Sequence, residues 1–110
     1  MRIPADALIA REKLTHYLLA PRPHDDKAGY LAQAGFAQFN PDQLERAIRE
    51  LIATNDAVED GESQYGIFYR VEGSLIGPDA TLEVVLIWML RHADGTMRFV
   101  TLKPRKERKS

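Results

Sequence analysis

The spacing of hydrophobic residues changes about half-way along the chain. Up to about residue 56, apolar residues recur at three- and four-residue intervals, which is typical of amphipathic helices, and from residue 64 they alternate with polar residues, as in strands. Helices followed by strands that short turns connect predict an α+β domain, with the helices packed on one face of an antiparallel sheet. This order of elements excludes the alternating βαβ plan with its phosphate-binding loops.

Three helices are expected in the first half. The first covers about residues 6–19 and ends before segment 20–25, whose prolines cannot continue a helix. The second covers about residues 26–34, with Gly35 in position to be a left-handed C-cap and Phe36 to fold back onto the helix.

The third helix is expected at residues 41–54. Asn40 suits the N-cap and Pro41 the first helical position, and Gln43 completes a capping-box pattern. The apolar stripe of this helix should lie on the sheet. The residues expected in the core are Leu44, Ile48, Leu51, Tyr69, Leu86 and Trp88.

Antiparallel strands are expected near residues 65–76, 81–92 and 96–103, with a shorter strand around 56–62. The connection at residues 77–79 is too short for a parallel crossover. Asp94 and Gly95 form the sequence of a two-residue hairpin turn.

The strand at 81–92 is apolar on both faces, because Val85, Ile87 and Met89 alternate with the core-facing residues. Such a strand is central and is covered on both sides. Two interpretations remain open for the second apolar face. It is an interface between two copies of the chain, or the sheet curves around its own core.

Composition indicates one soluble globular domain. The chain has 110 residues, of which 45% are hydrophobic and 28% charged. It contains no cysteine, so disulfides and thiolate metal sites are excluded, and no apolar stretch suggests a membrane partner. The N-terminus lacks the pattern of a secretory signal, so a cytoplasmic location is expected.

Charge divides the chain into a single domain at residues 1–104 and a basic tail at 105–110. The last eight residues contain Lys103, Arg105, Lys106, Arg108 and Lys109 against the single acid Glu107. The other 102 residues carry 10 basic and 15 acidic side chains. The tail either contacts phosphates or an acidic partner, or is a solvated terminus that folding does not need.

Known catalytic motifs are missing from the sequence. His16, His24 and His92 do not have metal-ligand spacing, and no phosphate-binding glycine loop occurs, so neither a metal nor a cofactor is expected. His24 lies three residues before Lys27, and an imidazole near an ammonium suits acid–base chemistry. The alternative is that His24 is an ordinary loop residue.

Segment 65–73 combines aromatic residues with a cation. Tyr65, Tyr69 and Arg70 on one strand resemble platforms that stack bases and hold phosphates. Alternating aromatic residues on a strand also form cores, and this second interpretation stays open.

The chain resembles a family of small bacterial domains of unknown function. The resemblance spans most of residues 3–104 and is carried by the segments IPA (3–5), DKAGYLAQAGF (26–36), YGIFYRVEGSLIGP (65–78), IW (87–88) and VTLKP (100–104). The order of elements in this family is similar to that of the barnase–EndoU–colicin–RelE group of toxin ribonucleases, which cleave RNA without a metal.

This second resemblance implies a set of site residues. Lys27 or Arg70 would stabilise the phosphate, His24 or Tyr69 would transfer protons, and Thr101 would position the scissile group. The residues that would bind substrate are Tyr65 and Lys103. The partners it implies are RNA and a cognate antitoxin or immunity protein.

Lys27 also raises a point of local stability. A lysine in the first turn of a helix is unfavourable at the positive end of the dipole, so either Asp26 or a bound anion should offset the cost. If Lys27 lies on the surface, replacing it with alanine is expected to change the free energy of unfolding by no more than about 0.5 kcal/mol.

Two functions from different classes are therefore carried forward. One is a metal-independent ribonuclease-like toxin of a toxin–antitoxin or toxin–immunity pair. The other is a non-enzymatic protein-binding or structural module, in one form a homodimer. The acidic body counts against RNA binding, because RNA-binding domains usually show a broad basic face. A concave site that joins Lys27, Arg70 and Thr101 would favour the enzyme, and scattered positions would favour the binding module.

Overall fold

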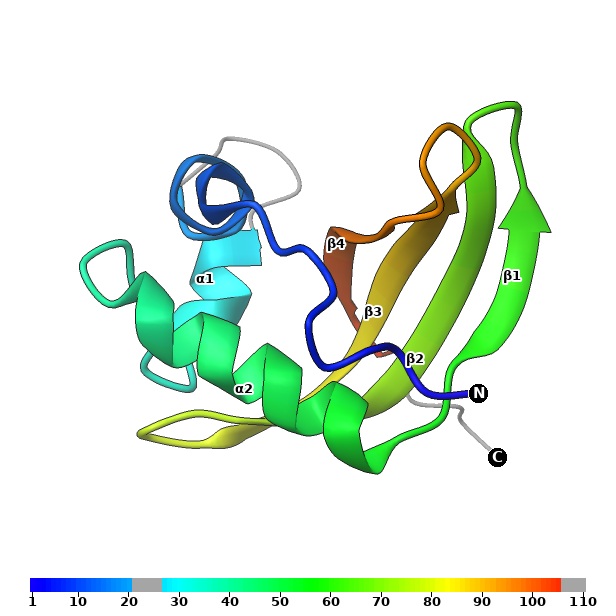
Figure 1. Ribbon diagram of the computed structural model, residues 1–110. Coiled ribbons are helices and arrows are strands. Elements are labelled where there is room, and N and C mark those ends of the chain that lie inside the picture. The colour runs from blue at the N-terminus through cyan, green and yellow to red at the C-terminus, as the bar shows by residue number, and fades with distance from the viewer. Residues whose placement is uncertain (21–26, 106–110) are drawn as a thin grey trace.

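The fold is an α+β domain, as the hydrophobic pattern predicts. The computed structural model describes residues 1–20 and 27–105. In chain order, the elements are the π-helix η1 (Lys13–Leu18), the α-helices α1 (Lys27–Ala32) and α2 (Pro41–Thr54), and the strands β1 (Val58–Glu62), β2 (Gly66–Ile76), β3 (Thr81–Arg91) and β4 (Met97–Pro104). The strands form one antiparallel sheet in the order β1-β2-β3-β4 (Figure 1).

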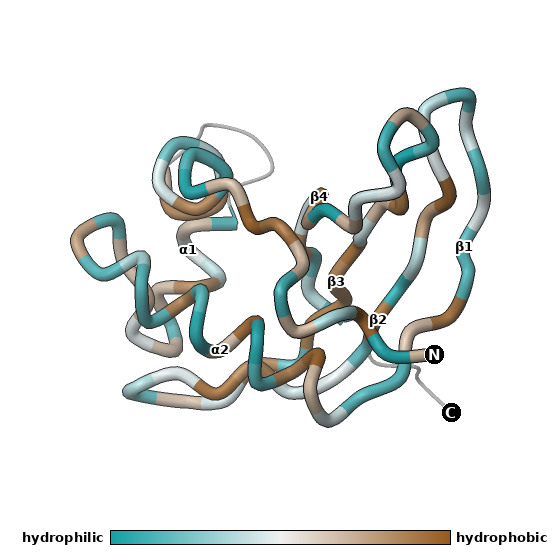
Figure 2. Tube along the Cα trace, viewed as in Figure 1, coloured by the Kyte–Doolittle hydropathy of each residue, from teal (hydrophilic) through white to brown (hydrophobic). Residues whose placement is uncertain are grey.

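One hydrophobic core fills the space between the helices and the sheet. The helices of the described chain lie on one face of the sheet (Figure 1), and hydrophobic stretches recur along α2 and the strands (Figure 2), whose buried residues belong to one cluster. The ring of Trp88 is fully buried and meets Phe99 edge-on, with ring centroids 5.4 Å apart. Leu44, Ile48, Leu51 and Leu86 are also buried, as expected. Tyr69 is a correction, because it is only half-buried at the margin of the core.

The helix expected at residues 6–19 is much shorter than predicted. Helical structure begins only at residue 11, and Leu8 instead pairs in parallel with Arg98 of β4. After a turn closed by a hydrogen bond from the Ala7 amide to the Pro4 carbonyl oxygen, Ala7 and Ile9 are buried while Leu8 is exposed, which is the alternation of an extended segment. Pairing with the free edge of β4 decides the conformation, since it satisfies backbone groups of both segments.

The end of α1 follows the predicted motif, although the regular helix covers Lys27–Ala32 and is shorter than 26–34. Gly35 has a φ of 93°, and the amide of Phe36 donates to the carbonyl oxygen of Leu31 at 3.2 Å. This is the Schellman pattern, in which only glycine takes the left-handed position without strain. The amide of Asp79 donates to the Ala34 carbonyl oxygen, so the helix end also holds the β2–β3 turn.

Helix α2 has the predicted bounds, but its N-terminus is not the expected capping box. The Asn40 side chain makes no hydrogen bond to the first helical amides. It accepts from the Ala37 amide at 2.7 Å and donates to Gln43 Oε1 at 3.0 Å. Asn40 therefore closes the preceding turn, because the fold-back after α1 brings the Ala37 amide closer than the helix amides.

The β3–β4 connection is longer than the expected two-residue turn. Arg91 and Thr96 pair through a backbone hydrogen bond of 2.9 Å and enclose residues 92–95. Gly95 occupies the left-handed region with a φ of 69°. The β2–β3 turn at 77–79 lies where predicted and joins two antiparallel strands.

Strand β4 contains a bulge that determines which side chains face the core. Thr101 is opposite Ile87, whereas Phe99 is opposite the next residue, Trp88, so Val100 is an extra residue. A bulge shifts the alternation of the strand by one. Phe99 and Leu102 therefore both point into the core, and Thr101 lies on the outer face of the sheet with Ile87.

The structure also bears on the basic tail and on membrane spans, both of which the sequence addressed. Arg105, assigned by sequence to the tail, forms ion pairs with Glu72 at 3.1 Å and Glu83 at 3.9 Å, so it is docked on the outer sheet face. The rest of the tail lies outside the described residues. No helix in the described ranges is long and apolar enough to cross a membrane.

The hydroxyl of Tyr30 provides a test of how α1 is held against β3. It donates to the Glu83 carbonyl oxygen at 2.7 Å, and burial, followed by repulsion from the Glu83 carboxylate, raises the pKa of Tyr30 above its ordinary 10.0. Because the folded state favours the protonated phenol of Tyr30, this group contributes stability that is fully present below pH 10. The contribution is lost as the pH rises through the pKa of the folded state. The melting temperature advantage of the wild type over Tyr30→Phe should therefore shrink as the pH rises above about 10. A constant difference across that range would contradict this role.

Candidate functional site

A hollow of about 490 Å³ lies where η1 runs beside the edge strand β4. We call it the η1–β4 hollow. It is lined by Glu12, Lys13, His16, Tyr17, Val100 and Thr101. The Lys13 ammonium donates to the Val100 carbonyl oxygen at 2.9 Å, which ties the helix to the bulge.

Tyr17 is the centre of a polar cluster in this hollow. Lys27 Nζ and Thr101 Oγ1 each donate to Tyr17 Oη at 3.4 Å. Lys27 Nζ also lies 5.4 Å from the centre of the Tyr17 ring, within range of a cation–π contact. Both distances are at the long end of the range for hydrogen bonds. In both of these hydrogen bonds Tyr17 Oη is the acceptor.

Three separate elements build the cluster. Tyr17 comes from η1, Lys27 opens α1, and Thr101 is turned to the outer side of β4 by the bulge. The bulge and the π-helix are both local irregularities of the kind that often occur beside functional sites. Each irregularity aims one hydroxyl of the cluster.

Lys27 is buried, which corrects the expectation of a surface residue. Its relative exposure is 9%, and it contacts Tyr17. Truncation to alanine would remove packing as well as charge, so the loss of stability should exceed that of an ordinary surface substitution. Asp26, the expected neighbour, lies outside the described residues.

The remaining residues predicted for the site are dispersed. Arg70 lies on the outer sheet face two strands from Thr101, in the same cross-strand row, and its ion pairs are with Asp60 at 3.5 Å and Glu72 at 3.0 Å. Tyr69, the residue before Arg70, faces the other side of the sheet. Lys103 is exposed near the end of β4. Lys27 and Thr101 are thus brought together, and Arg70 is not part of their cluster.

Tyr65 and His24 complete the comparison. Tyr65 is 66% exposed and lines a different hollow, at the end of the sheet. His24 lies outside the described residues, so its predicted role in proton transfer is not tested.

Sequence reasoning missed Lys13, His16 and Tyr17 as members of a site. Tyr17 follows Leu14 at helical spacing, a pattern that favours a place in the apolar stripe of a helix. The signal that could have found the site is the spacing of Lys13, His16 and Tyr17, three and four positions apart, which places polar groups on one side of a helix. A second signal is the interval of three between Phe99 and Leu102, which marks the bulge.

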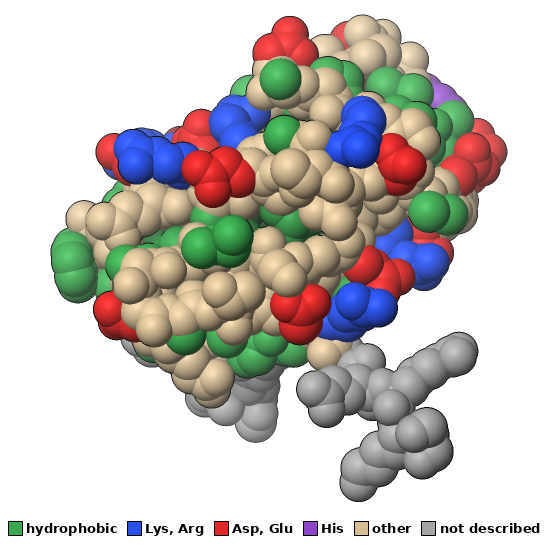
Figure 3. Space-filling model, turned by 90° about the horizontal axis from the view of Figure 1, so that it is seen from below, with side chains coloured by type: hydrophobic (Ala, Val, Ile, Leu, Met, Phe, Trp, Pro, Cys, Tyr) green, Lys and Arg blue, Asp and Glu red, His purple; other side chains and the backbone are tan. Residues whose placement is uncertain are grey.

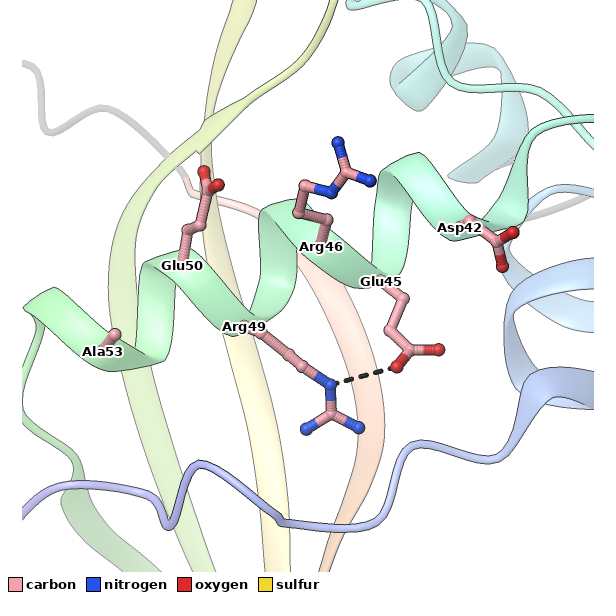
Figure 4. Close-up of a pocket in the computed structure, with 6 residues that line it drawn as sticks. All are labelled: Asp42, Glu45, Arg46, Arg49, Glu50 and Ala53. Carbon is pink, nitrogen blue, oxygen red and sulfur yellow. Dashed lines mark hydrogen bonds and ion pairs between the residues drawn. The ribbon is translucent and has the colours of Figure 1, made fainter.

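A third hollow, of about 560 Å³, follows the solvent face of α2 (Figure 4). Arg49 Nε donates to Glu45 at 3.0 Å, and its Nη1 donates to the carbonyl oxygens of Ala5 and Ala7 at 2.9 and 3.1 Å. Every side chain lining this hollow comes from one helix. Arg49 therefore holds the N-terminal segment against α2, which is a structural role.

The distribution of charge on the described surface is mixed. On the face seen in Figure 3, blue and red groups alternate and no broad basic patch forms among the coloured residues. The same residues contain no group of three or more histidine, aspartate or glutamate side chains that could hold a metal ion.

A comparison with models of known protein families gives a match over almost the whole chain. The model described as Domain of unknown function (DUF6883) matches residues 4–106. The chain belongs to this family. The match agrees with the resemblance seen in the sequence and includes the segments that carry Tyr17, Lys27 and Thr101. Comparisons of this DUF6883 domain with curated proteins and with solved structures give no match.

Proposed function

We propose that this DUF6883 domain is a metal-independent ribonuclease that acts at the η1–β4 hollow, as the toxin of a toxin–antitoxin or toxin–immunity pair. The observation that carries the proposal is the convergence of Lys27 and Thr101 on the Tyr17 hydroxyl, beside His16. The group of toxin ribonucleases that the sequence resembles uses these types of side chain.

The chemistry needs one base and one acid. His16 accepts the proton of a ribose 2′-hydroxyl, whose oxygen attacks the adjacent phosphorus atom, and the bond from phosphorus to the 5′-oxygen breaks. Tyr17 gives its proton to the departing 5′-oxygen. The products are a 2′,3′-cyclic phosphate and a 5′-hydroxyl, and no metal or external oxidant is needed.

Charge and position come from the neighbouring groups. Lys27 contacts both the ring and the hydroxyl oxygen of Tyr17 and so fixes the orientation of this side chain. Its positive charge stabilises the additional negative charge that the phosphate carries in the transition state. The Thr101 hydroxyl fixes the Tyr17 oxygen from the sheet side. Both are positioning residues, since Tyr17 is the group that would touch the substrate.

A second candidate function is a non-enzymatic binding module, including a homodimer. The observation that favours it is the outer sheet face. Val85, Ile87 and Met89 are half-buried there, and no helix of the described chain crosses to that side. An apolar stripe of this kind on an open sheet suits a protein partner such as an antitoxin.

The test is activity of the intact protein in the presence of a chelator. Incubated with single-stranded RNA and EDTA, the wild type should yield fragments ending in 2′,3′-cyclic phosphate, and its induced expression should slow growth. The matched substrate control is DNA of the same sequence, which lacks the attacking 2′-hydroxyl and should stay intact. If RNA also stays intact and growth is normal, the binding-module interpretation replaces the enzyme.

A further inference from the structure

The hollow around Tyr65 has features that the proposed cleavage site does not use. It has a volume of about 370 Å³ and lies at the end of the sheet, between the start of β2 and the β3–β4 connection. The side chains that carry the argument are those of Tyr65, Met89, Arg91 and Arg98. Within residues 1–20 and 27–105, no acidic residue lines it.

Tyr65 presents its ring to solvent from a fixed backbone. Its amide donates to Ser63 Oγ at 3.1 Å, and its carbonyl oxygen accepts from the His92 amide at 2.9 Å. An exposed ring on an anchored backbone loses little conformational freedom when a flat ligand stacks on it. Met89 provides the apolar floor of the hollow.

Two guanidinium groups are held at the rim of the same hollow. Arg91 and Arg98 share Asp94, at 3.9 and 3.7 Å, and Arg98 Nε also donates to Thr96 Oγ1 at 3.2 Å. Hydrogen bonds from the Thr96 hydroxyl and amide hold the pKa of Asp94 below its ordinary value, with smaller contributions from the two arginines. Asp94 therefore stays ionised and orients the two cations, and the three side chains together keep one positive charge.

Strand register connects this hollow with the cleavage site. Met89 is opposite Arg98, and Ile87 is opposite Thr101, all on the outer face of the sheet. Met89 and Ile87 are successive outward residues of β3, so the two rows are about 7 Å apart. A single strand that crosses the outer face could occupy both hollows.

We infer that the Tyr65 hollow is a subsite for one nucleotide of a single-stranded RNA, with the base stacked on Tyr65 and its phosphate at Arg91 and Arg98. The inference rests on the proposed ribonuclease function and names the substrate as single-stranded. Stacking on an aromatic ring accepts any base, so the subsite supplies affinity without strong sequence preference.

The test uses a short RNA whose 2′-hydroxyls are methylated, so that it binds without being cleaved. By fluorescence anisotropy, Tyr65→Leu should weaken its binding about tenfold or more, while Tyr65→Phe should bind as the wild type does. Arg98→Gln should lower the slope of log Kd against log salt concentration by about one. The matched controls are Phe39→Leu, an aromatic residue that is 88% exposed on the helical side, and Arg11→Gln, whose ion pair is with Asp42.

The outcomes separate the two proposals. If the wild type cleaves RNA but Tyr65→Leu binds unchanged, the subsite is wrong and the ribonuclease stands. If binding depends on Tyr65 but unmethylated RNA is not cleaved, the subsite stands and the cleavage function fails. If the wild type does not bind the methylated RNA, the subsite is overturned.

Discussion

Replacing Trp88 with alanine should lower the free energy of unfolding by about 3–5 kcal/mol. Trp88 is fully buried on the central strand, and its ring meets Phe99 edge-on at the point where the bulge begins. Alanine would leave a cavity between the sheet and the helices that surrounding side chains fill only in part. Urea unfolding followed by far-ultraviolet circular dichroism measures the change, because Trp88 is the only tryptophan and its fluorescence is lost in the variant.

Trp88→Phe is the control for this result. Among the described residues, Trp88 Nε1 has no hydrogen-bond partner, and a buried donor without one costs free energy. Phenylalanine removes that donor and keeps an aromatic ring. The Trp88→Phe protein should therefore lose much less free energy of unfolding than the Trp88→Ala protein. A loss below about 1 kcal/mol for Trp88→Ala would mean that the ring does not support the core.

Replacing Tyr17 with phenylalanine should lower the rate of RNA cleavage about 100-fold or more. The change removes the one hydroxyl on which Lys27 and Thr101 converge and keeps the ring. Loss of a proton donor that acts only in the transition state should lower kcat and leave KM almost unchanged. Tyr65→Leu should have the opposite signature, a raised KM, because stacking contributes to binding alone.

Tyr30→Phe is the matched control for Tyr17→Phe. It removes another phenol hydroxyl, with a shorter hydrogen bond of 2.7 Å to the Glu83 carbonyl oxygen, at a place outside the η1–β4 hollow. Its cleavage rate should equal that of the wild type. Cleavage by Tyr17→Phe at the wild-type rate would remove Tyr17 from the mechanism, whatever the effect on stability.

Lys27→Met and Thr101→Val test the two positioning residues. Methionine keeps most of the buried stem of Lys27 without the charge, which makes it a better probe than alanine at a position with 9% exposure. Each variant should lower kcat by less than Tyr17→Phe. Combined with Tyr17→Phe, either should add little further loss, because residues that act through one group are not additive.

Local patterns in the sequence were sufficient for most of the elements. Helix α2 has the bounds that Pro41 and its apolar stripe predict, and the alternating residues of β2 and β3 predict the antiparallel pair. Gly35 and Phe36 form the expected end of α1. These features depend on contacts between residues close in sequence, so a window of a few residues contains the information that determines them.

Tertiary structure decided the features that place the candidate site. The chain around Leu8 is extended because β4 offers an edge to pair with, and a window of neighbouring residues cannot include that partner. Thr101 faces outward because the bulge at Val100 lets Phe99 and Leu102 both reach the core. Tyr17 meets Thr101 across 84 positions of sequence. The sequence by itself determined the class of fold, and the resemblance in the order of elements suggested Lys27 and Thr101, which the fold brings together. Only the packing of η1 against β4 made Tyr17 their common partner, because side chains from separate elements come together only when the core forms.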